Sequence, residues 1–191
     1  MQVPLFPLNT VLFPGGPLPL RIFEPRYLDM LSRCMKDNAP FGVLLIREGG
    51  EVGPATTFEV GTLANVTDWY QGSDGILGVT AIRSQRFRLL GAEPQADGLN
   101  VGEVELIPDL PSQSLPSEFA PLAKILGHVL DEFGLLYEGL DRHYDDAVWV
   151  AYRVIEVLPV ALENKQTCLE SADVLDCLQY AQQMIHTQDS A

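Results

Sequence analysis

The sequence predicts an α+β fold, in which a mostly antiparallel β-barrel or sandwich is followed by a bundle of helices. Over roughly the first 110 residues, short apolar or alternating stretches are separated by glycine- and proline-containing turns, a pattern typical of strands. After about Glu118 the apolar residues recur at helical spacing. We therefore expect two subdomains, 1–110 formed mainly by strands and 117–187 formed by helices, joined by a polar, proline-containing linker over 109–116.

The first 27 residues, MQVPLFPLNTVLFPGGPLPLRIFEPRY, are apolar but contain six prolines. Proline fixes φ and lacks the N–H that a helix needs, so no continuous helix can run through this segment. A membrane-spanning helix needs about 20 apolar residues, and a secretory signal needs a basic start that Met1-Gln2-Val3 does not provide. We expect short extended pieces and turns here, in a cytoplasmic protein that does not bind membranes.

The remaining elements of the first subdomain follow from local signals. Pro25 suits the first turn of a helix, and the segment predicts a helix from there to about Asn38. Branched apolar residues bounded by Pro40 and a glycine pair predict a buried strand over 41–47. Further strands are expected over 58–70 and 76–83, joined as a hairpin by a glycine-containing loop at 71–75, and over 86–90 and 101–107.

Three helices are expected in the second subdomain, over about 118–133, 145–158 and 172–186. Ser117 and Ser171 precede the first and third of these helices and are suitable N-caps. Asp145 and Asp146 suit the start of the second helix, because negative charge is favourable at a helix N-terminus.

The charge balance limits the classes of partner. The net charge is −14 and the pI is near 4.4, whereas nucleic acids and anionic membranes are bound mainly through Lys and Arg. We therefore expect no nucleic-acid partner. Arg83, Arg86 and Arg88 could form an anion site, although they are also compatible with the outer face of a strand whose inner face carries Phe87 and Leu89.

No catalytic motif stands out. The sequence has no GxxxxGK[ST] loop, GxSxG elbow or HExxH helix. The three cysteines are widely spaced without a CxxC pair, which indicates buried thiols rather than a zinc site or a disulfide framework. His143, with Asp141, Asp145 and Asp146 nearby, could suggest a metal, but the pattern also fits a solvated helix start. We expect no catalytic residues, no metal and no cofactor.

Trp69 and Tyr70 are the candidate binding residues, because they stand beside the hairpin loop at 71–75. Exposed aromatic residues near a hairpin tip are common partner contacts. The alternative is that they pack onto the helical part.

Several strings resemble the Lon N-terminal, or substrate-binding, domain family and cover nearly the whole chain. They are PLFPL at 4–8, LFPG at 12–15, RIFEPRY at 21–27, FGV at 41–43, GTLA at 61–64 and RF at 86–87, followed by Trp149, Arg153, Leu158-Pro159 and Lys165-Gln166. The resemblance implies a PUA-like β-barrel followed by a helical bundle. It also implies a region that, in the full-length protease, helps to select substrates while separate ATPase and peptidase domains act on them. The sequence departs from the family pattern at Cys168, where a leucine is expected.

The motif strings also have a physical interpretation. Pro4, Pro7 and Pro14 favour an edge or bulge position for the N-terminal strand. We expect Ile22 and Phe23 to be buried where the barrel meets the first helix, and Glu24 and Arg26 to flank the start of that helix with a possible salt link.

The leading functional hypothesis is a non-enzymatic binding or adaptor module for unfolded polypeptide or a partner protein. The alternative is a small-molecule or anion-binding regulator that uses the strand from Arg83 to Arg88. An unrecognised hydrolase is a third hypothesis, supported only by the abundance of acidic residues.

Overall fold

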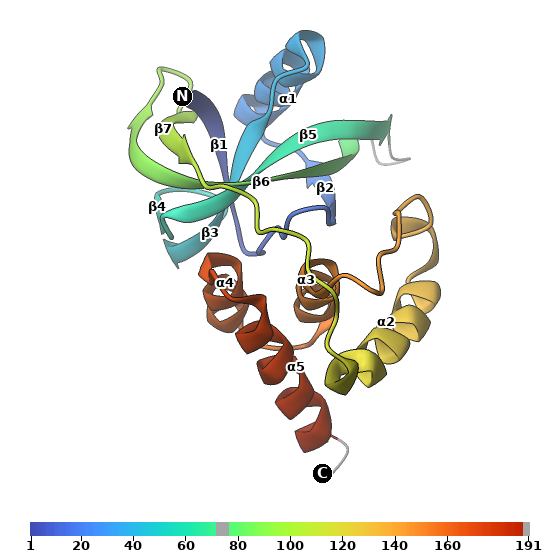
Figure 1. The fold of residues 1–191 in the computed structure, drawn as a ribbon. Coiled ribbons are helices and arrows are strands. Elements are labelled where there is room, and N and C mark those ends of the chain that lie inside the picture. Colours follow the sequence, from blue (N-terminus) through green and yellow to red (C-terminus); the bar gives the residue numbers. More distant parts are fainter. Residues whose placement is uncertain (72–76, 189–191) are drawn as a thin grey trace. The chain divides into compact units, whose positions relative to one another are not determined.

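The computed structural model describes residues 1–71 and 77–188, apart from the side chains at positions 71, 82–84 and 188. The chain divides into two compact units, Met1–Asp109 and Leu110–Ala191 (Figure 1). The first unit contains the strands and one helix, and the second contains the remaining helices. The α+β fold predicted from the sequence is confirmed.

The strand unit contains one sheet, which has seven strands in the described residues. Its elements are β1 (Gln2–Leu8), β2 (Pro17–Ile22), α1 (Pro25–Asp37), β3 (Phe41–Gly49), β4 (Ala55–Thr57), β5 (Val60–Gln71), β6 (Leu77–Pro94) and β7 (Asn100–Leu106). The two strands expected over 76–83 and 86–90 are parts of the single long strand β6. The expected glycine-containing loop falls largely on residues 72–76, outside the described part of the chain.

The sheet closes on itself through β1. Residues 2–4 of β1 pair antiparallel with β7, and residues 5–8 pair parallel with β3. With the antiparallel β7–β6, β6–β5 and β5–β3 pairs, this makes a closed ring. Closure removes the exposed edges that an open sheet would present. β2 lies outside the ring and pairs antiparallel with the first part of β6, from Leu77 to Ile82.

Helix α1 packs against the strands by one face. Pro25 begins it as predicted, and Asn38 ends it in the left-handed conformation with φ of 49°, which asparagine tolerates better than most residues. Its buried side chains join the core that also contains residues of β1, β2, β3, β5 and β6; those of the helix are Tyr27, Met30, Leu31 and Cys34.

Arg86 differs from its expected position on an outer strand face. Only 3% of it is exposed, and its guanidinium donates to the carbonyl oxygen of Pro108 at 3.5 Å. The backbone N–H of Ile107 also donates to the carbonyl of Arg86, so the chain leaving β7 runs alongside this part of β6. Arg88 is exposed and Phe87 is buried, as predicted, while the side chain of Arg83 lies outside the described part of the structure.

The helical unit is built around helix α3. Its elements are a 3-10 turn at Ser117–Phe119, α2 (Ala120–Glu132), a second 3-10 turn at Gly134–Leu136, α3 (Ala147–Val157), α4 (Leu162–Glu170) and α5 (Val174–Gln188). Figure 1 shows α3 between α2 on one side and α4 and α5 on the other. All of the residues of α3 from Val150 to Ile155 are buried, which explains why this segment is apolar on most faces.

The sequence prediction missed α4 and misplaced two helix caps. Among the nine residues of α4 only Gln166, Cys168 and Leu169 are buried, so the helix carries no clear apolar stripe. Ser117 begins a 3-10 turn rather than capping α2. Ser171 is the C-cap of α4, and it is the side chain of Asp173 that accepts from the N–H of Leu175 at the start of α5.

A group of polar side chains lies in the interior of the helical unit. The Glu156 carboxylate accepts a hydrogen bond from the Tyr137 hydroxyl at 2.5 Å and forms a 2.9 Å ion pair with Arg153, of which only 1% is exposed. The ammonium of Lys165 donates to the backbone carbonyl of Glu156 at 2.7 Å. Burial raises the pKa of Glu156, against the opposing effects of Arg153, Tyr137 and Lys165, and burial lowers the pKa of Lys165. Buried charges require such partners.

None of the helices in residues 1–71 and 77–188 combines the length and the apolar character needed to cross a bilayer.

Candidate functional site

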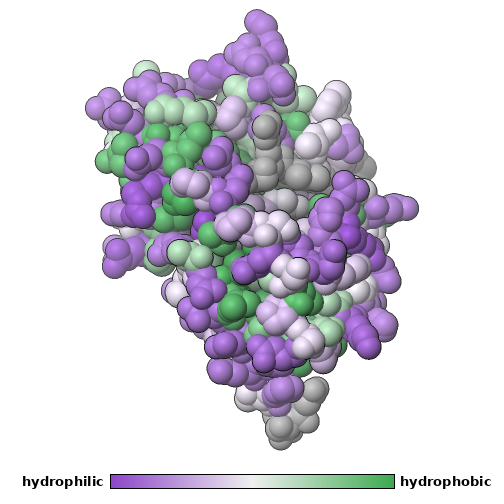
Figure 2. Space-filling view, in the orientation of Figure 1, coloured by the Kyte–Doolittle hydropathy of each residue, from purple (hydrophilic) through white to green (hydrophobic). Residues whose placement is uncertain are grey.

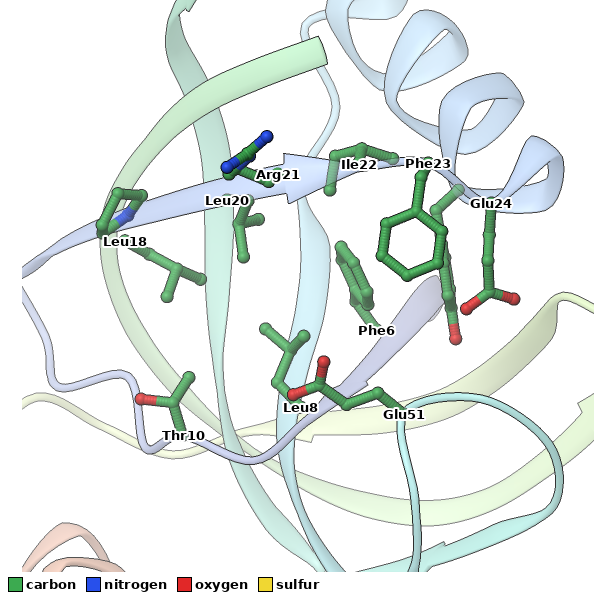
Figure 3. A pocket seen from close by; sticks show the side chains of 12 residues that line it. Phe6, Leu8, Thr10, Leu18, Leu20, Arg21, Ile22, Phe23, Glu24 and Glu51 are labelled. Carbon is green, nitrogen blue, oxygen red and sulfur yellow. The ribbon is translucent and has the colours of Figure 1, made fainter. Parts of the chain in front are cut away.

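A recess of the strand unit lies between β2, the start of α1 and the end of β1. We call it the β2–α1 pocket; its volume is 420 Å³. Figure 3 shows the residues that line it. They are Phe6 and Leu8 of β1, Thr10, the run from Leu18 to Glu24, Tyr27 and Glu51.

The floor of the pocket is apolar because β2 alternates. Leu18, Leu20 and Ile22 point inward and are buried, whereas Pro19 and Arg21 are exposed. Figure 3 shows Leu20 directed into the recess and Arg21 directed to the other side of the strand. On the opposite wall the ring of Phe6 stacks on that of Tyr27, with centroids 4.0 Å apart.

Phe23 is exposed, which corrects the prediction that it would be buried. Ile22 is buried as expected, but 64% of Phe23 is exposed. β2 ends at Ile22, so Phe23 lies beyond the alternating strand, and its ring stands at the open rim of the recess rather than in the core. Figure 3 shows its ring beside the recess, near Phe6 and Glu24. An exposed aromatic ring at the rim of an apolar recess is a typical partner contact.

The polar part of the rim is held in place by a second set of contacts. The guanidinium of Arg26 binds the Glu24 carboxylate at 2.9 Å, donates to the carbonyl of Gly98 at 3.0 Å and lies 4.6 Å from the centre of the Tyr27 ring. The predicted Glu24–Arg26 salt link is confirmed. Glu24 precedes α1 but its carboxylate makes no cap hydrogen bond, because Arg26 holds it.

Glu51 closes the pocket on the side of the β3–β4 connection. Its carboxylate accepts the backbone N–H of Asn9 at 2.8 Å. Burial raises the pKa of the Tyr27 phenol, Arg26 lowers it, and Glu24 and Glu51 raise it further. Tyr27 is therefore a neutral hydrogen-bond donor at physiological pH, and the lining residues include no histidine or cysteine that could act as a nucleophile or base.

The outer edge of β2 is poorly suited to pairing with another strand. Pro17 and Pro19 have no N–H, and their partners across the pair with β6 are Ile82 and Thr80. Within a paired edge strand, proline is confined to positions whose N–H side faces away from the partner, so we infer that both prolines reduce the donors on the outer edge of β2. A ligand at this pocket is therefore better accommodated through side-chain contacts than through addition of a strand.

Trp69 and Tyr70, the residues predicted to bind, do not line the pocket and do not share a surface. Both are more than half exposed, at 57% and 58%. In the register of the sheet, Trp69 of β5 lies opposite Val79 of β6, and Val79 lies opposite Leu20 of β2. The next position follows the same pattern, with Tyr70 of β5 opposite Gly78 of β6 and Gly78 opposite Arg21 of β2. Residues opposite each other in a sheet project from the same face. Trp69 thus shares the sheet face of the pocket residue Leu20, and Tyr70 projects from the other face over Gly78.

One part of the pocket can be predicted from the sequence. The alternation of Leu18, Leu20 and Ile22 with Pro19 and Arg21 places the three apolar side chains on one face of the strand, and this face forms the floor of the pocket. The contributions of Phe6, Tyr27 and Glu51 had no such signal, because they meet β2 only through the closure of the sheet and the packing of α1.

No group of three or more His, Cys, Asp and Glu side chains in the described part of the chain is arranged to hold a metal ion. Among the acidic residues around His143, Asp146 has a structural role. Asp146 caps α3 by accepting the N–H groups of Val148 and Trp149 at 2.7 and 3.0 Å, and the His143 ring lies edge-on to Trp149. The prediction that the acids at this point suit a helix N-terminus is confirmed for Asp146.

Comparison with known proteins identifies similar chains. The family model described as the ATP-dependent protease La (LON) substrate-binding domain matches residues 2–187. A Lon N-terminal domain protein from Xanthomonas campestris has a similar structure, with a TM-score of 0.77 and 32% identity, over 94% of this chain and 96% of that one. The N-terminal domain of the Mycobacterium avium complex Lon protease shares the fold, with a TM-score of 0.66 at 13% identity, over 96% of this chain and 97% of that one.

Curated proteins with similar sequences are much longer. Protein cereblon of Danio rerio is 30% identical over 126 residues, which are 63% of this chain and 29% of that protein. The Lon protease of Anaeromyxobacter dehalogenans (strain 2CP-C) is 23% identical over 180 residues, which are 90% of this chain and 21% of that protein. The match thus spans less than a third of either relative.

Proposed function

Because the chain belongs to the family of ATP-dependent protease La (LON) substrate-binding domains, we propose that it is a non-enzymatic module that binds polypeptide segments. The β2–α1 pocket carries this proposal, since it combines a buried apolar floor with an exposed phenylalanine at its rim. Its volume of 420 Å³ lies near the lower end of the range for ligand pockets, about 300–1,000 Å³, and suits one or two apolar side chains.

The mode of binding follows from the edge of β2. Pro17 and Pro19 deprive this edge of two N–H donors, so the backbone of the ligand gains little from pairing with it. An apolar side chain of the ligand would enter the recess between Leu20 and Phe6, and a neighbouring side chain would lie against Phe23. Such contacts tolerate many sequences, which is what a binder of unfolded polypeptide requires.

Electrostatics supports a polypeptide rather than a nucleic acid as the ligand. The net charge of −14 repels phosphate backbones, while it attracts segments that carry Lys or Arg. Figure 2 shows a largely hydrophilic face with separate hydrophobic areas over both units, rather than one continuous apolar surface. This arrangement favours reversible contact with short segments. An adaptor role, in which the bound segment is passed to a partner protein, is part of the same proposal.

The structure removes Arg86 from the set of arginines that could bind an anion in the alternative hypothesis. Arg86 is buried and directed to the carbonyl of Pro108, so it does not project from the strand beside Arg88. An anion on this strand would therefore lack the Arg86 cation.

The proposal is tested by fluorescence anisotropy with a labelled, permanently unfolded polypeptide, such as a reduced and alkylated globular protein. Phe23→Ser should weaken binding by about tenfold, because an aromatic anchor is worth more than about 1 kcal/mol. The matched control is Leu90→Ser, since Leu90 is exposed to a similar extent, 59%, in the same unit but does not line the pocket. Equal affinities for wild type and Phe23→Ser would reject the pocket, and no saturable binding to wild type would reject the function.

A further inference from the structure

Two of the three cysteines meet where α4 joins α5. Cys168 lies in the last turn of α4, and Cys177 lies in the first turns of α5. The Cys177 thiol lies 3.7 Å from the backbone carbonyl oxygen of Cys168 and 3.9 Å from that of Asp173. Both thiols are buried and neither forms a disulfide in this structure.

The backbone between the two helices is held by short-range hydrogen bonds. The Ser171 hydroxyl donates to the carbonyl of Asp173 at 2.8 Å and accepts the N–H of Asp173 at 3.1 Å. The Asp173 carboxylate then accepts the N–H of Leu175 at 2.9 Å and so starts α5. These contacts fix the turn between α4 and α5.

A recess gives a small molecule a route to this pair. Both cysteines line it together with Asn164, Thr167, Asp176 and Tyr180, and its volume is 230 Å³. The Asn164 side-chain amide donates to the Tyr180 hydroxyl at 2.8 Å. A recess of this volume is large enough to admit hydrogen peroxide or a small organic hydroperoxide. Cys34 also lines a recess of 230 Å³, so the presence of a second thiol, and not access alone, distinguishes the pair from Cys34.

We propose that Cys168 and Cys177 form an oxidisable dithiol that reacts with a hydroperoxide to give a disulfide between α4 and α5. Cys168 is the attacking residue, because the Cys177 thiol donates to the carbonyl oxygens of Cys168 and Asp173 and is thereby held in its protonated form. Hydrogen bonding with the Cys177 thiol also lowers the pKa of Cys168.

The reaction balances in two steps. The Cys168 thiolate attacks one peroxide oxygen, so that an S–O bond forms and the O–O bond breaks; this gives a sulfenic acid and an alkoxide, which takes up a proton. The Cys177 sulfur then attacks the Cys168 sulfur, an S–S bond forms, and hydroxide leaves as water with the proton from Cys177. The two thiols lose two electrons in total, and the hydroperoxide is reduced to an alcohol and water.

Cys34 provides a matched internal control. It is also buried, and burial raises its pKa. It lies in α1, where its thiol is 4.0 Å from the carbonyl oxygen of Pro40, and no second cysteine is present in the strand unit. We therefore expect Cys34 to remain a thiol under conditions that oxidise the pair.

The test treats the full chain with hydrogen peroxide, blocks the remaining thiols with an alkylating agent in denaturant, and analyses tryptic peptides by mass spectrometry. No Lys or Arg follows Lys165, so residues 166–191 form one peptide that contains both cysteines. We expect the oxidised peptide to be two hydrogens lighter and to carry no alkyl group. Its disulfide should form at least about tenfold faster than Cys34 is oxidised. With Cys177→Ser, a dione reagent for sulfenic acids should label Cys168 instead.

Three outcomes would overturn the proposal. The first is that the peptide is alkylated at both cysteines after peroxide treatment. The second is that a cysteine sulfur gains oxygen without forming the disulfide, and the third is that Cys34 oxidises as fast as the pair.

Discussion

The rings of Phe6 in β1 and Tyr27 in α1 are stacked, with centroids 4.0 Å apart and planes 21° apart. Phe6 also contacts Phe41 of β3, at a centroid distance of 6.2 Å. The stack therefore connects the strand that closes the sheet to the helix that covers it. Because Phe6 and Tyr27 also form a wall of the β2–α1 pocket, the stability of the strand unit and the shape of the pocket depend on the same contact.

Phe6→Ala should destabilise the protein by about 3–5 kcal/mol, because it removes a buried aromatic ring and leaves a cavity beside Tyr27. Phe6→Leu keeps much of the apolar volume and should cost clearly less. Urea denaturation followed by circular dichroism measures both changes. Equal losses for the two variants would show that cavity formation is not the cause.

Gly61 of β5 and Gly78 of β6 both lie in the β5–β6 pair, but substitution by alanine should destabilise the protein to different extents at the two positions. A Cβ at Gly61 would lie 2.3 Å from the backbone oxygen of Val43, which cannot move without disturbing β3, and Gly61→Ala should cost about 2–3 kcal/mol. A Cβ at Gly78 would meet only the ring of Tyr70, at 2.3 Å, and this exposed ring can swing away.

Gly78→Ala should therefore change the unfolding free energy by less than about 1 kcal/mol, since alanine also restricts the unfolded chain. The same denaturation experiment compares the two variants directly. A larger cost at Gly78 than at Gly61 would contradict the argument.

Asp146→Ala should cost about 0.5–2 kcal/mol, because Asp146 accepts two N–H groups at the start of α3 and also the hydroxyl of Ser112. Asp146→Asn preserves a side-chain oxygen and should retain most of the stability. Thermal unfolding of the two variants distinguishes the cap from a purely electrostatic effect. If asparagine were as harmful as alanine, the charge rather than the hydrogen bonds would be responsible.

Tyr137→Phe should lower stability at neutral pH by about 1–3 kcal/mol, since Glu156 loses a buried donor. Burial first, then Glu156, raises the pKa of Tyr137 well above its usual value. A raised folded-state pKa stabilises the protein below the unfolded-state pKa of about 10, and this contribution is lost as the pH rises above it.

The difference in unfolding free energy between wild type and Tyr137→Phe should therefore narrow as the pH rises above about 10, the pKa of tyrosine in the unfolded chain. Urea midpoints at a series of pH values measure this gap. A gap that stays constant over the range would show that Tyr137 does not titrate differently in the folded and unfolded states.

Trp69→Ala should weaken the proposed binding of unfolded polypeptide more than Tyr70→Ala, because the register places Trp69 on the sheet face of Leu20. We expect a loss of about threefold to tenfold for Trp69 and less than twofold for Tyr70. The two residues are adjacent and similarly exposed, so each is the control for the other. An equal or reversed effect would place the binding surface elsewhere.

Local patterns in the sequence were sufficient for the α+β class, the first helix at Pro25 and the Glu24–Arg26 pair. These depend on the proline at a helix start, on alternation along a strand and on charges two residues apart. The same local reasoning failed for α4, which is held by burial of only three residues and carries no apolar stripe. It also failed for Arg86, which is buried beside the chain that leaves β7.

Only the tertiary structure determined which residues form the candidate site. The pocket needs β1, β2, α1 and Glu51 in one place, and the closure of the sheet brings them together from positions as distant in sequence as Phe6 and Glu51. Likewise, adjacency along the chain suggested that Trp69 and Tyr70 act together, whereas the register of β2, β6 and β5 separates them onto two faces. Local conformation depends on neighbouring residues, but a shared surface depends on strand register and packing between distant segments.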